Sequence, residues 1–193
     1  MTMTSPAPGE ARSPGLSYQD LHKNDSRPVP EVLRWVNWEF MGDADLPVAA
    51  YTSREWHELE KEKVWKRVWQ MACREDDVPN VGDTLRYEIC ESSILVIRTK
   101  PNEIRAFHNT CRHRGAIVAR EPEGNTRSYT CFYHGWSYNT DGCLRGAPAM
   151  KQNVDFSVSD YRLPHYRCEE WLGWVMVSLN KDARPVAEEF GDV

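Results

Sequence analysis

The sequence lacks the long apolar segments that place proteins in membranes. No run of about 18 apolar residues occurs, so we expect no membrane-spanning helix. The N-terminus has no apolar core of the kind found in secretory signals, which indicates a cytoplasmic protein. The formal net charge is −5, so the basic excess typical of nucleic-acid binding is also missing. We therefore expect neither a membrane nor a nucleic acid as partner.

A disulfide framework is not expected either, although the chain has six cysteines. Disulfides form in secreted proteins, and no secretory signal is evident at the N-terminus of this sequence. Two of the cysteines also stand beside histidines in a regular pattern, which favours metal binding.

Composition and periodicity divide the 193 residues into four segments. These are a flexible N-terminal tail and arm over 1–45, a helical lead-in over 46–75, a β domain over 76–180, and the start of a linker over 181–193. The tail is rich in Pro, Ser, Thr, Gly and Ala, which bury too little apolar surface to order a chain. The lead-in contains a predicted helix over 53–71, with Ser53 as its N-cap. Its apolar positions, which we expect to pack against the domain, are Trp56, Leu59, Trp65, Val68 and Trp69.

The segment 76–180 alternates short apolar runs with turn residues. This pattern is typical of a mainly β protein, here a small antiparallel domain preceded by an N-terminal helix. The strands that we predict cover 84–90, 93–99, 103–109, 128–131, 136–139, 143–145, 166–169 and 174–179. Residues 146–164 are expected to be irregular.

Two short Cys/His arms stand out within this domain. The first is Cys111-x-His113 and the second is Cys131-x-x-His134. Two thiolates and two imidazoles on two converging loops suit a [2Fe–2S] cluster of the Rieske type, in which two histidines replace two cysteines on one iron. Gly115 and Gly135 follow the arms closely, and a residue without Cβ lets the backbone approach inorganic sulfide.

A Cys₂His₂ zinc site is the alternative use of these four residues. Zinc fingers order their ligands as a Cys pair followed by a His pair, whereas here Cys and His alternate. The iron–sulfur interpretation is therefore preferred, and a zinc-stabilised interaction module is kept as the weaker alternative.

The sequence around the arms resembles a known family. The segments C-R-H-R-G and C-F-Y-H-G-W-S-Y-N-T-D-G-C-L-R-G-A-P look like the N-terminal Rieske domain of aromatic-ring-hydroxylating oxygenase large (alpha) subunits. The preceding helix and V-P-N-V-G-D also resemble that family's lead-in, and the likeness covers roughly residues 46–193. A free-standing Rieske ferredoxin, an electron carrier, is the alternative, but it would not need the helical lead-in.

The resemblance implies an oxidoreductase that hydroxylates aromatic compounds. In the family, a ferredoxin or flavin reductase donates electrons to the Rieske cluster, which passes them to a mononuclear Fe(II) in a catalytic domain. That iron is bound by two His and one carboxylate. The family's subunits commonly form trimers in which a cluster serves the neighbouring subunit.

One part of the family pattern is missing from this sequence. No D/E-x-x-H-x₄-H segment occurs, so we expect the mononuclear iron to lie in a catalytic domain that this chain does not contain. Oxygen activation by the chain alone is not expected, whereas electron transfer is.

The residues beside the arms predict a cluster of low potential. Rieske proteins of respiratory cytochrome complexes carry Ser where Trp136 stands and a disulfide where Ala116 and Phe132 stand; only Tyr138 keeps its place. Fewer hydrogen-bond donors stabilise the reduced cluster less. We expect a potential toward the low end of the Rieske range of about −150 to +300 mV.

The remaining polar residues near the arms receive simpler interpretations. A basic rim that could attract an acidic donor would comprise Arg105, Arg112, Arg114, Arg120 and Arg127, unless these are scattered solvated charges. His108 is expected to make a structural hydrogen bond. Four further cysteines are expected to pack in the interior, namely Cys73, Cys90, Cys143 and Cys168.

Overall fold

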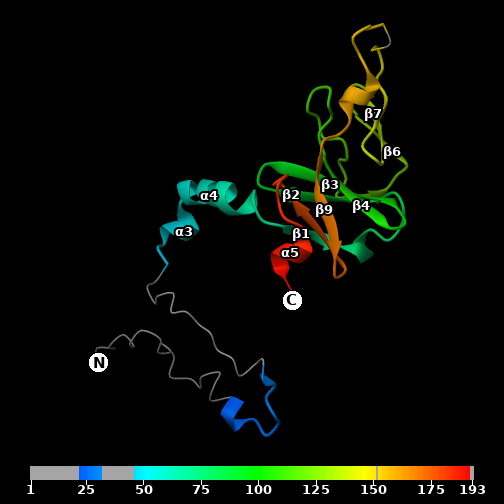
Figure 1. The fold of residues 1–193 in the computed structure, drawn as a ribbon. Helices are drawn as coiled ribbons and strands as arrows, with labels where there is room; N and C mark the ends of the chain where they lie inside the picture. Colours follow the sequence, from blue (N-terminus) through cyan, green and yellow to red (C-terminus); the bar gives the residue numbers. More distant parts are fainter. Residues whose placement is uncertain (1–21, 32–45, 151, 192–193) are drawn as a thin grey trace. The chain divides into compact units, whose positions relative to one another are not determined.

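The structure is a computed structural model, and it describes residues 22–31, 46–150 and 152–191. Compactness divides the chain into two units, residues 1–52 and 53–193. The expected tail and arm at 1–45 lie mostly outside the described residues. The first unit contains the short helix α3 (Ala49–Thr52), and the second contains the β domain (Figure 1).

The β domain is built on a curled antiparallel sheet, as the strand pattern predicted. Its strand order is β1-β10-β9-β4-β3-β2-β5. In chain order these strands are β1 (Gln70–Arg74), β2 (Asp83–Ile89), β3 (Ser92–Lys100), β4 (Glu103–His108), β5 (Glu123–Asn125), β9 (His165–Trp171) and β10 (Trp174–Ser178). The mainly β fold class is therefore confirmed.

A second, three-stranded sheet stands on one side of the first (Figure 1). It consists of β6 (Ser128–Thr130), β7 (Ser137–Asn139) and β8 (Leu144–Gly146) in that order. The turn between β7 and β8 contains Gly142 at a φ of 81°. A Cβ there would lie 2.6 Å from the ring of Phe107 on β4, so only glycine lets the two sheets meet this closely.

Strand β3 contributes to two hydrophobic cores because both of its faces are buried. Ile94 and Val96 belong to the core that includes Val175 and Val177 of β10. The alternate residues of β3 point to the opposite face. There Leu95 and Ile97 share a core with Cys111, Cys131 and the small sheet.

The predicted helix over 53–71 is too long. The structure has α4 (Arg54–Glu60), continued by a π-helical turn η1 (Lys61–Trp65), and β1 begins at Gln70. Ser53 is the N-cap, as expected, and its side chain accepts a hydrogen bond from Trp56 N. Val68 and Trp69, which directly precede β1, continue the apolar spacing of the helix. The short edge strand therefore looked like one more helical turn.

The apolar face of this helix is also less buried than expected. Trp69 is buried, but Trp56 and Trp65 remain 39% and 40% exposed. The helix is instead connected to the β2–β3 turn by Lys61, which forms ion pairs with Glu58 and Glu91. No helix among the described residues has the length and apolarity needed to cross a bilayer.

Three further short elements complete the second unit. They are η2 (Glu75–Asp77), η3 (Val158–Tyr161) and α5 (Val186–Phe190). The last lies in the expected linker, yet Val186 is 1% exposed and Trp69 Nε1 donates a hydrogen bond to Arg184 O at 2.9 Å. This part of 181–193 therefore packs against the domain.

Candidate metal centre

The first Cys/His arm forms a tight loop directly after β4. Cys111 N donates to Ala116 O at 2.8 Å, and Gly115 N donates to Cys111 O at 2.9 Å. A φ of 72° at Gly115 turns the backbone back toward the start of the loop. The bridge between Thr110 and Ile117 closes its base.

The second arm repeats this backbone arrangement at the tip of the β6–β7 hairpin. Cys131 N donates to Trp136 O at 2.7 Å, and Gly135 N donates to Cys131 O at 3.0 Å. Gly135 has a φ of 71°. Each cysteine therefore occupies the same position in a five-residue turn, although His113 follows its cysteine by two residues and His134 by three.

The structure brings the four predicted ligands into one place. Cys111 and Cys131 are each 2% exposed and belong to the same core. The rings of His113 and His134 lie edge to face, with centroids 4.6 Å apart. The two thiols thus lie inside and the two imidazoles lie toward the surface.

The chemistry of these donors fits a two-iron cluster. His113 Nδ1 is buried and has no hydrogen-bond partner, which is unfavourable unless the nitrogen binds something else. Burial, then the charges of His134 and Arg114, lower the pKa of His113 and favour the neutral imidazole that binds metals. Two thiols and two imidazoles are the donor set of a Rieske cluster, in which the cysteines bind one iron and the histidines bind the other.

Tyr138 connects the two loops through its hydroxyl group. The oxygen lies 3.3 Å from Cys111 Sγ and accepts a hydrogen bond from Arg112 N at 2.9 Å. Burial, together with Cys111, raises the pKa of Tyr138, so the phenol keeps its proton. The protonated hydroxyl can donate to the sulfur, which is the role expected of Tyr138.

Aromatic side chains fix the orientation of His113. Trp136 stacks on its ring with centroids 4.9 Å apart and planes 10° apart. Phe156 and Tyr161 contact Trp136 edge to face at 5.6 and 5.4 Å. Both come from the stretch expected to be irregular, where their aromatic character was the only signal of a role at the site.

Asn109 is a further residue whose role the sequence did not reveal. It is fully buried directly before the first arm. Its side chain accepts from Ala119 N at 2.7 Å and donates to Ala119 O at 2.8 Å. The amide therefore joins the two ends of the first loop, which has no strand ladder to do so.

The structural interpretation of His108 is confirmed. Its ring stacks on Tyr166 with centroids 4.0 Å apart, and Nδ1 lies 3.3 Å from the Tyr166 hydroxyl. Among the other cysteines, burial raises the pKa of both Cys73 and Cys168 to about 12, as for packing thiols. Cys90 and Cys143 are free thiols with partial exposure.

The expected basic rim is only partly present. The guanidinium of Arg105 pairs with Glu103 at 2.6 Å, and that of Arg120 lies over the ring of Phe132. Arg112, Arg114 and Arg127 are exposed.

Comparison with known proteins agrees with this geometry. Residues 68–167 match the model of the Rieske [2Fe-2S] domain, and the chain belongs to this family. Its cofactor is accordingly a [2Fe–2S] cluster. Within the family, the chain is homologous to the N-terminal part of the alpha subunits of aromatic-ring-hydroxylating dioxygenases.

Two curated relatives and one solved structure illustrate the match. The chain is 33% identical to 2-aminobenzenesulfonate 2,3-dioxygenase subunit alpha from Alcaligenes sp., over 74% of this chain and 37% of the relative. It is 36% identical to the anthranilate 1,2-dioxygenase large subunit from Acinetobacter baylyi, over 72% and 30%. Naphthalene 1,2-dioxygenase from Rhodococcus sp. superposes with a TM-score of 0.72 at 33% identity, over 76% and 34%. The chain thus spans about a third of the length of these proteins.

Proposed function

We propose that this chain transfers single electrons within a ring-hydroxylating oxygenase, and that Cys111, His113, Cys131 and His134 hold its cluster. The observation that carries the proposal is the repeated loop, which places two buried thiols and two adjacent imidazoles at one site. When bound, a [2Fe–2S] cluster accepts and releases one electron at a time.

The chain's own residues supply the setting for this chemistry. The Tyr138 hydroxyl lies 3.3 Å from the Cys111 sulfur, to which it would donate once that sulfur is a thiolate, and Trp136 stacks on the His113 ring. The thiols lie in the core, which excludes water from that side. The imidazoles lie closer to the surface, where a partner protein can approach.

The alpha-subunit relatives favour an oxygenase component over a free-standing ferredoxin. On this proposal, the donor is a ferredoxin or a flavin reductase, and the acceptor is a mononuclear iron in a catalytic domain. We also propose a trimeric assembly of the whole oxygenase in the cytoplasm. The support is the similarity to dioxygenase subunits and to a quaternary ammonium Rieske monooxygenase, 27% identical over 75% of this chain with a TM-score of 0.70.

Metal analysis and electron paramagnetic resonance of the purified chain test the proposal. We expect about two irons and two acid-labile sulfides per chain, and a signal from one unpaired electron after reduction. Binding of one zinc per chain, with no such signal, would support the interaction module instead.

A matched pair of histidine variants tests the ligand assignment. His134→Ala should lose the reduced-state signal, because it removes one imidazole from the site. His108→Ala also removes an imidazole near the first loop, but it should keep the signal, because His108 bonds Tyr166. Retention of a normal signal in His134→Ala would contradict the assignment.

A further inference from the structure

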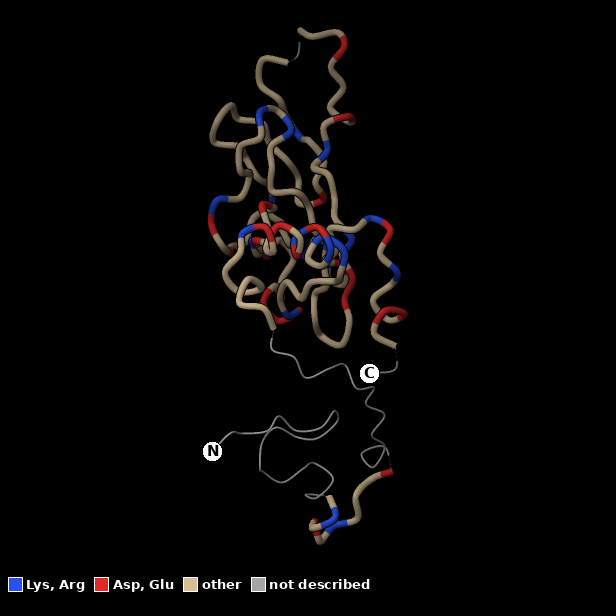
Figure 2. Tube along the Cα trace, turned by 90° about the vertical axis from the view of Figure 1, so that its left-hand side faces the viewer, with Lys and Arg blue, Asp and Glu red and all other residues tan. Residues whose placement is uncertain are grey.

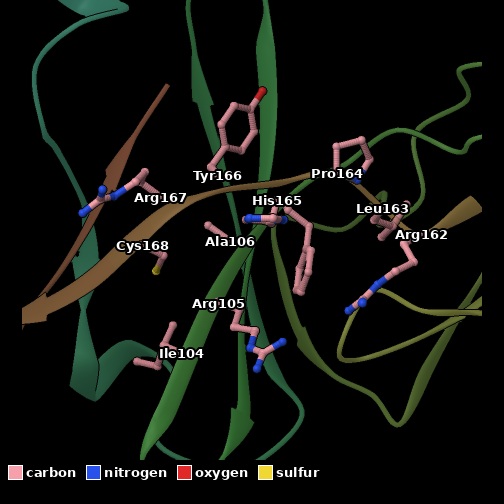
Figure 3. Close-up of a pocket in the computed structure, with 11 residues that line it drawn as sticks. Ile104, Arg105, Ala106, Arg162, Leu163, Pro164, His165, Tyr166, Arg167 and Cys168 are labelled. Carbon is pink, nitrogen blue, oxygen red and sulfur yellow. The ribbon is translucent and has the colours of Figure 1, made fainter. Parts of the chain in front are cut away.

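Three hollows on the surface of the β domain meet at Pro164. Their volumes are about 590, 620 and 310 Å³. The first lies between β4 and β9, which pair only through Ala106 with Tyr166 and Phe107 with His165 (Figure 3). His165 also lines the second hollow, and His108 lines the second and the third. Neighbouring hollows therefore share parts of their walls, and we refer to the three together as the groove.

The charge of this groove is one-sided. Basic and acidic residues are interspersed along the described parts of the chain (Figure 2), and the chain has a formal net charge of −5. The residues that line the three hollows nevertheless include no Asp or Glu. The basic side chains that line them are Arg105, His108, Arg112, Arg162, His165, Arg167 and Lys181.

Not all of these charges are available to a partner. Glu103 neutralises Arg105, and Glu169 neutralises Arg167 at 2.5 Å. Within the described residues, no ion pair involves Arg112, Arg162 or Lys181. Lys181 and Arg112 lie close enough to His108 to lower its pKa, after the larger effect of burial. Three cations without an ion-pair partner among the described residues thus line the groove.

The groove ends at the candidate metal centre. The third hollow is lined by Cys111, Arg112 and Gly115 of the first loop. His108 N donates to Pro164 O at 2.8 Å, which fixes the wall of the groove to the end of β4, next to that loop. A protein surface seated along the groove would therefore face the first loop.

We propose that an acidic electron-donor protein docks in this groove, with its carboxylates on Arg112, Arg162 and Lys181. The inference rests on the proposed electron-transfer function, and it places the first loop on the side from which electrons enter the cluster. The exposed Phe132 and Tyr133 of the second loop lie outside the groove. The basic lining provides charge complementarity, which mainly increases the rate of encounter.

Stopped-flow reduction of the full chain with a reduced acidic plant-type [2Fe–2S] ferredoxin tests the docking site. At low ionic strength, the double variant R162Q/K181Q should react about tenfold more slowly, because two steering charges are lost. The variant R127Q/R145Q removes the same charge from exposed residues outside the groove and should change the rate less than about twofold. Added salt should slow the wild type and reduce the difference between the variants.

A gain-of-rate variant excludes damage to the fold as the cause. Asp182 is exposed next to Lys181. Removing its charge in D182N should raise the rate with ferredoxin by about twofold, because repulsion of an acidic partner decreases.

A cationic reductant, reduced benzyl viologen, separates the two hypotheses. It should reduce R162Q/K181Q at a rate that equals or exceeds its rate with the wild type. Normal viologen reduction with equal ferredoxin rates in R162Q/K181Q and R127Q/R145Q would overturn the docking site alone. A chain without a reducible cluster would overturn the proposed function itself.

Discussion

The two ligand loops have the same backbone turn but different supports and different surfaces. The second loop is the tip of a hairpin, held by the three residue pairs of β6 and β7. The first loop has one isolated bridge and depends on the Asn109 side chain. Between its cysteine and its glycine, the first loop carries Arg112 and Arg114 beside the histidine. The second loop carries the exposed Phe132 and Tyr133 at the corresponding part of the turn. The shared turn positions the donors, and the differences determine how each loop is stabilised and what it can contact.

The largest expected effect concerns the cysteines, where the loops should behave alike. Cys111→Ser and Cys131→Ser should each reduce iron content more than tenfold, because each removes a thiolate from the cluster. Iron per chain and the visible spectrum provide the measurement. Cys73→Ser, at a buried thiol remote from the loops, is the control and should retain iron. A much smaller loss for one of the two loop cysteines would break the equivalence.

Asn109→Ala should reveal the weaker support of the first loop. It removes both bonds to Ala119 and one to the Ser93 hydroxyl, and it leaves part-buried backbone groups of Ala119 unpaired. The free energy of unfolding should therefore fall by about 2–3 kcal/mol. Asn139→Ala, at an exposed position of the hairpin, should lower it by less than about 0.5 kcal/mol. Urea unfolding measures both. Equal losses would mean that Asn109 has no special role in closing the loop.

Substitution of the two loop glycines by alanine should lower the stability of the domain by moderately different amounts. Gly115→Ala should destabilise by about 1 kcal/mol, the usual strain of a side chain at positive φ. Gly135→Ala should destabilise by about 2 kcal/mol, because its Cβ would also lie 3.3 Å from Pro148 Cγ, whereas nothing lies within 4 Å at Gly115. Comparison of the urea midpoints checks the order, and a larger loss at Gly115 would reverse it.

Tyr138→Phe should give the smallest effect. It should change the midpoint potential of the cluster and leave the amount of bound cluster unchanged. Loss of a hydrogen bond of about 1 kcal/mol to the Cys111 sulfur should lower the midpoint potential by about 40 mV. Tyr129→Phe is the matched control, since its buried hydroxyl has no hydrogen-bond partner. The wild-type midpoint should lie below about +150 mV. A redox titration that shows a higher midpoint, or no decrease in Tyr138→Phe, would contradict these expectations.

The sequence predicted the parts of this site that depend on local spacing. The cysteines, histidines and glycines of the loops lie within a few residues of each other, and alternation identified most strands. The sequence could not show that residues 70–74 pair with β10. Val68 and Trp69, which directly precede this edge strand, continue the apolar spacing of the helix and so favoured one more helical turn. Nor could the sequence bring Phe156 and Tyr161 to Trp136, or show that Glu103 neutralises Arg105. These contacts depend on how distant segments pack.

The double-sided burial of β3 has a consequence for how long the cofactor stays bound. Leu95 and Ile97 share a core with Cys111 and Cys131, and their neighbours Ile94 and Val96 hold the second core. An opening wide enough to release iron would expose part of the first core and weaken a strand on which the second depends. The lifetime of the bound cluster should therefore follow the unfolding rate of the whole domain, and a mutation far from the loops could shorten it.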